Sequence, residues 1–281
     1  MGYDCSISLN PKRLLAMKNL TAIARAFFCI GIAGIGVLQF YYKGFRPVMV
    51  PLWPSWLPGM LTCAYILSTI FILFSLFILL NRKAKDCALL LGGIFLLFLV
   101  VAQIPYMLIV YPYPWHLGSW TDPLKVLALS GSAFVVAGSY SSRVTRDNAM
   151  MKVLAAIIPY GKVFFGIMLL LFGIDHFLYV QFVSTLVPDW IGNIVFWSDL
   201  AGVALIGTGL SIILNIKRRL VCMLAGIMLF IWVIVLHIPR SIGHPEIADK
   251  ANEMTSVFEA ILFSGVAFLI AIENDNRRNR R

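Results

Sequence analysis

Apolar residues dominate long, unbroken runs of this chain, and short polar segments separate the runs. Eight runs are long enough to cross a hydrocarbon core of about 30 Å, which takes about 20 residues in a helix. They lie near 22–42, 60–80, 87–110, 123–141, 157–180, 192–214, 220–239 and 254–272. The runs are too long and too uniformly apolar for barrel strands, so each is expected to be a helix that satisfies its own backbone hydrogen bonds. The pattern predicts an all-α, polytopic membrane protein with eight transmembrane helices.

The sequence also repeats itself. Residues 36–53 and 173–190 share seven identities in eighteen positions at a shift of 137, from Gly36/Gly173 to Trp53/Trp190. Chance alone gives about one identity in such a stretch. The match reappears downstream at a shift of 134, for example at Pro105/Pro239 and Phe134/Phe268. The chain is therefore interpreted as a tandem duplication of a four-helix unit.

This interpretation divides the chain into five segments. The two four-helix repeats are the largest of them, and basic segments flank and connect them. The predicted boundaries are 1–21 for an N-terminal segment, 22–141 for the first repeat, 142–156 for a basic connection, 157–272 for the second repeat and 273–281 for a basic tail.

Composition and charge agree with a membrane location. The chain is 60% hydrophobic and only 13% charged, whereas soluble domains carry about 25% charged residues. Its net charge of +10 comes from basic clusters between the apolar runs, which is the distribution that orients membrane helices and not one that indicates nucleic-acid binding. Because the termini, the 81–86 and 215–219 turns and the 142–152 segment hold most of these residues, we expect both termini to be cytoplasmic. A bacterial inner membrane is the expected location, with the lipid bilayer as the main partner.

The second repeat carries ionisable residues where the first is mostly uncharged. His176 corresponds to Gln39, His237 to Gln103 and Glu259 to Lys125. Asp175, Asp199 and Arg240 stand opposite Leu38, Thr62 and Tyr106. On the expected topology these residues share one membrane level near the outer side, where buried charges are costly and should pair within a water-accessible interior.

Two interpretations of this constellation stay open. In the structural one, Arg240 neutralises an acid, and Lys125 pairs with Glu259 across a pseudo-two-fold axis. In the functional one, the same groups bind the polar head of a ligand, with Asp175, His176, His237 and Glu259 as the chemically active side chains. Arg240, Asp199, Lys125, Gln39 and Gln103 then complete the binding site. Haem ligation by the histidines and a metal site are the less favoured alternatives, because no dedicated motif accompanies them.

Short motifs add a family resemblance. Gly173, His176 and Phe177 form a GxxHF unit, and a Val187-Pro188-Asp189-Trp190 exit, a glycine-rich helix and a basic turn follow it. This arrangement resembles the DoxX-like family of four-helix membrane proteins, here as two fused units. The resemblance implies a membrane helical bundle and, for some members, association with thiosulfate and quinone oxidoreduction. The acid that many members carry in the second helix would align with Leu205, and Asp199 lies earlier in this chain.

These observations favour an outward-facing site for a small amphipathic redox molecule such as a quinone, which would make the chain a component of a membrane oxidoreductase with a redox partner protein. A non-enzymatic scaffold, assembly factor or lipid-binding protein is the first alternative. A small-molecule transporter is the second, and the cytoplasmic end of the bundle lacks a matching set of polar residues to support it.

Overall fold

The structure, a computed structural model, describes residues 11–51, 58–141, 149–243 and 246–273. Within these ranges the chain is helical, with turns between helices and no β-strand. The predicted all-α class is therefore confirmed. The long helices are α1 (Pro11–Tyr41), α2 (Met60–Leu79), α3 (Ala84–Phe98), α4 (Thr121–Gly138), α5 (Ala149–Leu178), α7 (Ile194–Leu214), α8 (Arg218–Trp232) and α10 (Ile247–Ile272).

Shorter helical pieces extend these helices or form the connections. They are η1 (Leu99–Gln103), η2 (Tyr106–Val110), η3 (Leu117–Trp120), α6 (Val180–Val183), η4 (Ser184–Leu186), η5 (Asp189–Ile191), η6 (Val233–His237) and α9 (Ile238–Gly243). The expected basic connection at 142–156 lies outside the described residues up to position 148, and α5 occupies the remainder.

Seven helical segments in the described ranges are long and apolar enough to cross a membrane, which indicates an integral membrane protein. They match seven of the eight expected runs, and α10 is the most buried of them. The eighth run, 123–141, forms α4, which is not among the seven. Most of α4 is buried, and its small residues, such as Ser130 and Gly131, lower its hydropathy while allowing neighbouring helices to approach closely.

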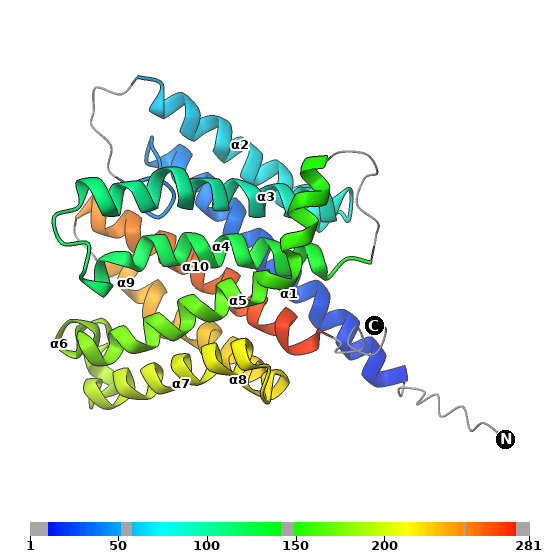
Figure 1. Ribbon diagram of the computed structural model, residues 1–281. Helices are drawn as coiled ribbons and strands as arrows, with labels where there is room; N and C mark the ends of the chain where they lie inside the picture. The colour runs from blue at the N-terminus through cyan, green and yellow to red at the C-terminus, as the bar shows by residue number, and fades with distance from the viewer. Residues whose placement is uncertain (1–10, 52–57, 142–148, 244–245, 274–281) are drawn as a thin grey trace.

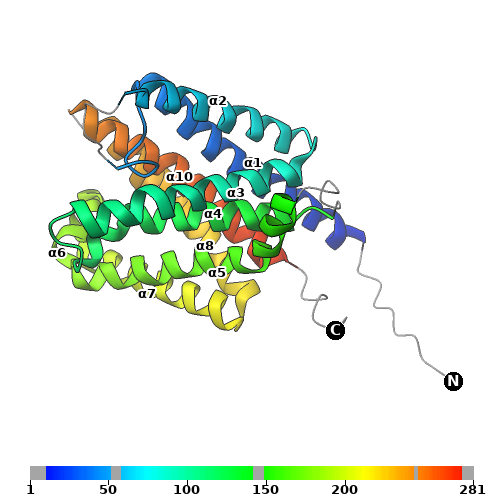
Figure 2. The same ribbon diagram turned by 45° about the horizontal axis from the view of Figure 1, so that its top comes forward.

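Helices from the two halves of the chain pack against each other. In Figures 1 and 2, α1 lies along α10 and α4 lies along α5, while α2 and α3 flank the first half and α7 and α8 flank the second. The start of α1, the turns at 80–83 and 215–217 and the end of α10 lie together at one end of the bundle (Figure 1). We call this end the basic end, and we call the other end, with the loops at 42–51, 111–120 and 184–193, the opposite end.

Two long helices continue past a proline through π-helical turns. The π-helix η1 precedes Pro105, and η6 precedes Pro239. Proline has no backbone N–H and its ring clashes with the preceding turn, so the helix must adjust there. The wider π turn supplies this adjustment, and it places Gln103 and His237 at the last position of their respective turns.

Glycines bring α5 and α7 into close contact. A Cβ added at Gly202 would lie 2.8 Å from the His176 Cβ, and one at Gly209 would lie 2.6 Å from the Gly166 carbonyl oxygen. Gly207 faces open space. The glycine-rich helix thus serves helix packing at Gly202 and Gly209, and this packing fixes the backbone that carries His176.

Candidate functional site

A buried ion pair joins α4 in the first half of the chain to α10 in the second half. Lys125 Nζ on α4 lies 2.9 Å from Glu259 Oε2 on α10, and the side chains are 19% and 3% exposed. The predicted pairing of these two residues is confirmed. The two side chains meet because α4 and α10 both lie inside the bundle and contact each other. Lys125 and Glu259, which occupy matching positions of the sequence repeat, therefore face each other.

A second ion pair lies next to the first, on the α9–α10 side. Arg240 Nη2 lies 2.6 Å from Glu253 Oε1, and the side chains are 22% and 18% exposed. The partner of Arg240 is therefore Glu253, one of the acids outside the predicted set. The sequence pattern concealed it because the apolar run was expected to begin at 254, whereas α10 begins at Ile247.

His237 lies within electrostatic range of both ion pairs. It closes η6, and the charges of Lys125, Glu253 and Arg240 all act on its imidazole. We call these five residues the central cluster: Lys125, His237, Arg240, Glu253 and Glu259. The cluster combines side chains from α4, from the η6–α9 segment and from α10.

Two buried atoms of the central cluster have no hydrogen-bond partner among the described residues. They are Glu259 Oε1 and His237 Nδ1. A buried polar atom without a partner costs about 1–3 kcal/mol, so such atoms are rare and are a reason to look for a ligand. The cluster can offer a hydrogen-bond acceptor at Glu259 and, in the appropriate tautomer, a donor at His237.

The other face of α10 is held by the loop that follows α1. Arg46 Nη2 donates to Asn252 Oδ1 over 3.0 Å, and the Arg46 guanidinium lies over the Tyr42 ring at 5.2 Å. Burial lowers the pKa of Arg46, and the interaction with Tyr42 partly offsets this effect. The first part of α10, at the opposite end of the bundle, therefore contacts both halves of the chain, through Arg46 and through Arg240.

The remaining predicted residues form a separate group between α5 and α7. His176 Nδ1 lies 2.8 Å from the Phe172 carbonyl oxygen, and the Asp199 carboxylate acts on its ring. Asp175 interacts electrostatically with His116, whose exposed ring stacks on Tyr179 at 4.5 Å. We call Asp175, His176 and Asp199 the α5–α7 group. His116 lies in an exposed loop.

The structure thus distributes the predicted site residues over two groups. In the described part of the chain, no hydrogen bond or ion pair links the α5–α7 group to the central cluster. The reason lies in the helix order, because α5 packs between α4 and α7, while α10 packs between α1 and α8. A common membrane depth, which the sequence predicts, does not fix which way each helix turns its polar face.

The two predicted glutamines serve the first half of the chain. Gln39 Nε2 donates to Ser68 Oγ over 3.0 Å, which joins α1 to α2. Gln103 Nε2 donates to the carbonyl oxygens of Pro47 and Val48 over 3.0 and 2.9 Å. Gln103 therefore fixes the loop after α1, whereas its counterpart His237 keeps an unpartnered ring nitrogen.

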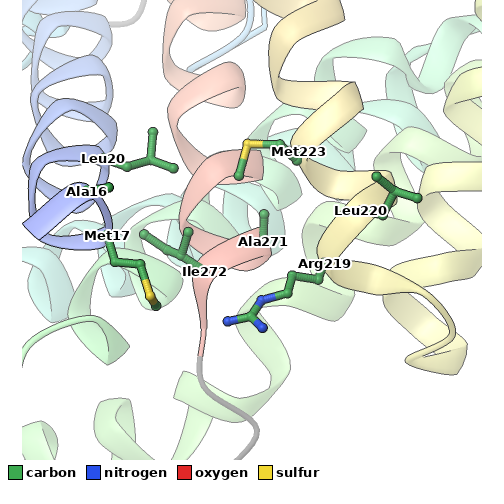
Figure 3. Close-up of a pocket in the computed structure, with 8 residues that line it drawn as sticks. All are labelled: Ala16, Met17, Leu20, Arg219, Leu220, Met223, Ala271 and Ile272. Atoms are coloured by element: carbon green, nitrogen blue, oxygen red, sulfur yellow. The ribbon is translucent and has the colours of Figure 1, made fainter. Parts of the chain in front are cut away.

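A hollow of about 450 Å³ lies at the basic end, and none of the predicted site residues lines it (Figure 3). It is bordered by α1, α8 and the end of α10. Among the described residues, no three His, Cys, Asp or Glu side chains gather closely enough to hold a metal ion.

Comparison of the chain with protein-family models, with curated protein sequences and with solved structures finds no match.

Proposed function

We propose that this integral membrane protein binds the polar head of a small amphipathic redox molecule, with a quinone as the representative ligand, at the central cluster. The observation that carries the proposal is the pair of unpartnered buried atoms, Glu259 Oε1 and His237 Nδ1. The other oxygen of Glu259 binds the Lys125 ammonium. The α5–α7 group, which the sequence analysis included in the site, is not part of this proposal.

The chemistry of a quinone head suits these atoms. A quinone oxygen is an acceptor for His237 Nδ1–H or for the Lys125 ammonium, and the hydroxyl of the reduced form is a donor to Glu259. Ligand pockets of this kind combine an apolar enclosure with a few polar groups that fix orientation. The π turn that positions His237 is a further support, because such turns often occur at functional sites.

The proposal includes an architecture of two fused four-helix units. Supporting it, Ser130 Oγ donates to the Gly92 carbonyl over 2.8 Å, and Ser264 Oγ donates to the Gly226 carbonyl over 2.7 Å, each pair being 134 residues from the other. Lys125 and Glu259 then occupy equivalent positions beside the pseudo-two-fold axis. The DoxX-like resemblance agrees with this architecture and with a quinone as ligand, and both remain proposals.

A structural role is the second candidate. It is favoured by the two ion pairs, because Lys125–Glu259 joins α4 to α10 and Arg240–Glu253 joins α9 to α10 without any ligand. In that case the central cluster would hold the two halves of the molecule together.

Replacing His237 by glutamine, the residue at the equivalent position 103, separates these candidates. We expect His237→Gln to weaken binding of decylubiquinone by about tenfold, which corresponds to one lost hydrogen bond of about 1.4 kcal/mol in a buried site. Binding is measured by equilibrium dialysis of the purified protein in detergent, and melting temperature reports folding. His116→Gln makes the same change on an exposed loop and should leave binding unaltered.

The structural role predicts a different outcome. If neither the natural chain nor His116→Gln binds the quinone, and His237→Gln lowers only the melting temperature, the ligand site is wrong. His176→Gln tests the α5–α7 group in the same assay, since a loss confined to that variant would move the site there.

A further inference from the structure

The hollow at the basic end is an apolar groove with one charged residue in its lining. The lining residues come from three helices (Figure 3): Met17 and Leu20 from α1, Leu220 and Met223 from α8, and Ile272 from α10. Arg219 is the charged lining residue. This groove does not overlap the central cluster, and its interpretation is independent of the proposed ligand there.

The groove lies where membrane spans end. The spans that border it are Leu15–Tyr41, Arg218–Gly243 and Ile247–Ile272, so Met17, Arg219 and Ile272 all fall within the first or last few residues of a span. Residues at such positions lie at the level of lipid headgroups, with acyl chains below them.

The corresponding region of the other half is filled by protein. There, the first part of α5 changes direction (Figure 1) and crosses towards α3 and α4, and Pro159 lies inside this helix. A Cβ at Gly93 would lie 3.0 Å from Leu154 Cδ2, and one at Gly138 would lie 2.9 Å from Ile158 Cγ2. Aliphatic side chains therefore occupy the space beside these two helices.

In the first half, α1 has no proline where α5 has Pro159. Ala22 stands at that position by the shift of 137, and Met17 stands where α5 has Leu154. Proline kinks a helix because it removes a backbone hydrogen bond and clashes with the preceding turn. Without it, α1 does not cross towards α8, and exposed aliphatic residues such as Leu220 and Leu224 remain on α8, 61% and 57% exposed.

Charge identifies the headgroup that suits this groove. Glu273, the acid at the end of α10, is already engaged, because Lys162 Nζ lies 3.1 Å from its Oε2 and Arg218 forms an ion pair with the same oxygen. Partial burial acts to raise the pKa of Glu273, but the two cations outweigh it and hold the pKa below its ordinary value. Among the described residues Arg219 forms no hydrogen bond or ion pair, so its guanidinium can receive an external anion.

We propose that the groove binds an anionic phospholipid, with acyl chains against Met17, Leu20 and Met223 and the phosphate on Arg219. The acyl chains take the place that Leu154 and Ile158 occupy in the other half. Arginine suits the headgroup because its planar fork binds phosphate oxygens through two parallel hydrogen bonds. At the basic end the bound lipid fills the space between α1 and α8, which touch further along through the stacked rings of Phe27 and Phe230, 5.3 Å apart. On the other side, α5 itself packs against α3.

Native mass spectrometry of the detergent-purified protein tests this proposal, with phosphatidylglycerol and phosphatidylcholine added separately. We expect retention of phosphatidylglycerol in preference to phosphatidylcholine. Arg219→Gln should weaken that retention by about tenfold or more, the usual effect of losing a hydrogen bond to a charged group. Arg82→Gln is the matched control, because Arg82 is exposed in a turn at the same end and does not line the groove.

Two more variants test the proposal if Arg219→Gln does not fold. Arg219→Lys keeps the charge without the fork and should give an intermediate loss. Ala16→Phe fills the groove and should displace the lipid while the melting temperature of the lipid-free protein is kept. Equal retention of both lipids, or equal losses in Arg219→Gln and Arg82→Gln, overturns the proposal. A dimer that Ala16→Phe dissociates also overturns it, since the groove would then hold a second copy of the chain.

Discussion

At the scale of single residues, the energetics of the Lys125–Glu259 pair depend on burial. Glu259 is 3% exposed, and its second carboxylate oxygen has no partner among the described residues. Removing one member of a buried pair leaves an uncompensated charge, which commonly costs about 3–5 kcal/mol, whereas removing both costs much less. The pair therefore contributes to the unique arrangement of α4 and α10 more clearly than to net stability.

Substitutions at this pair should consequently be non-additive. Lys125→Met and Glu259→Leu should each destabilise the protein by about 3–5 kcal/mol, and the double variant should lose less than either single one. Free energies of unfolding in mixed micelles provide the measurement. Lys162→Met is the control, because its pair with Glu273 is 28% and 47% exposed and should be worth about 0–1 kcal/mol. Additive losses would show that the two charges do not interact.

The residue scale also shows what the sequence could predict about the site. Equivalent positions in the repeat and opposite charges were sufficient to predict Lys125 with Glu259. The partner of Arg240 was not predictable from the apolar run, because Glu253 precedes it while still belonging to α10. Nor could membrane depth alone separate His176 from His237, since their grouping depends on the packing order of α5 and α10.

At the scale of helices, the contact between α5 and α7 depends on glycines at particular positions. A Cβ added at Gly209 would lie 2.6 Å from the Gly166 carbonyl oxygen and 2.7 Å from the Leu170 nitrogen, and both are backbone atoms that cannot rotate away. Gly207, two residues earlier, faces open space. A helix that carries several glycines was thus predictable as a packing helix, but the glycines in the interface were not.

The two glycines give a matched experiment. Gly209→Ala should lower stability by about 1–3 kcal/mol through overpacking, because the backbones of α5 and α7 would have to separate. Gly207→Ala should be neutral or stabilise the helix by up to about 1 kcal/mol through its higher helix propensity. Thermal unfolding in detergent distinguishes these cases. Equal effects of the two substitutions would mean that the close approach of α5 and α7 is not maintained in solution.

Helix boundaries illustrate the same limit of sequence analysis. The expected run at 220–239 continues in the structure as α8, η6 and α9 to Gly243, because the π turn accommodates Pro239. The apolar runs therefore predicted where the long helices lie, but α1 and α5 begin at Pro11 and Ala149, well before the expected starts at 22 and 157. Hydropathy alone could not predict that polar ends such as 247–253 remain helical, because neighbouring helices and Arg46 hold them in place.

At the scale of the whole molecule, the two halves of the chain exchange helix contacts. The first helix of each half packs against the last helix of the other half, α1 on α10 and α5 on α4. Basic residues of both halves lie at the same end, where Arg25 Nε donates to Ser139 Oγ over 2.9 Å and joins α1 to the segment after α4.

The position of these basic residues at one end predicts how the protein is oriented in the membrane. Basic residues near the ends of membrane helices are retained on the cytoplasmic side, so the basic end, with both termini and the turns at 81–86 and 215–219, should face the cytoplasm. The test uses a variant whose native cysteines are replaced and in which one cysteine is introduced at Arg82 or at Trp115, both exposed. In intact cells an impermeant maleimide should label position 115 and not position 82, and permeabilised cells should show labelling at both. Labelling of position 82 from outside would show that the predicted orientation is wrong. The phospholipid groove would then lie in the outer leaflet.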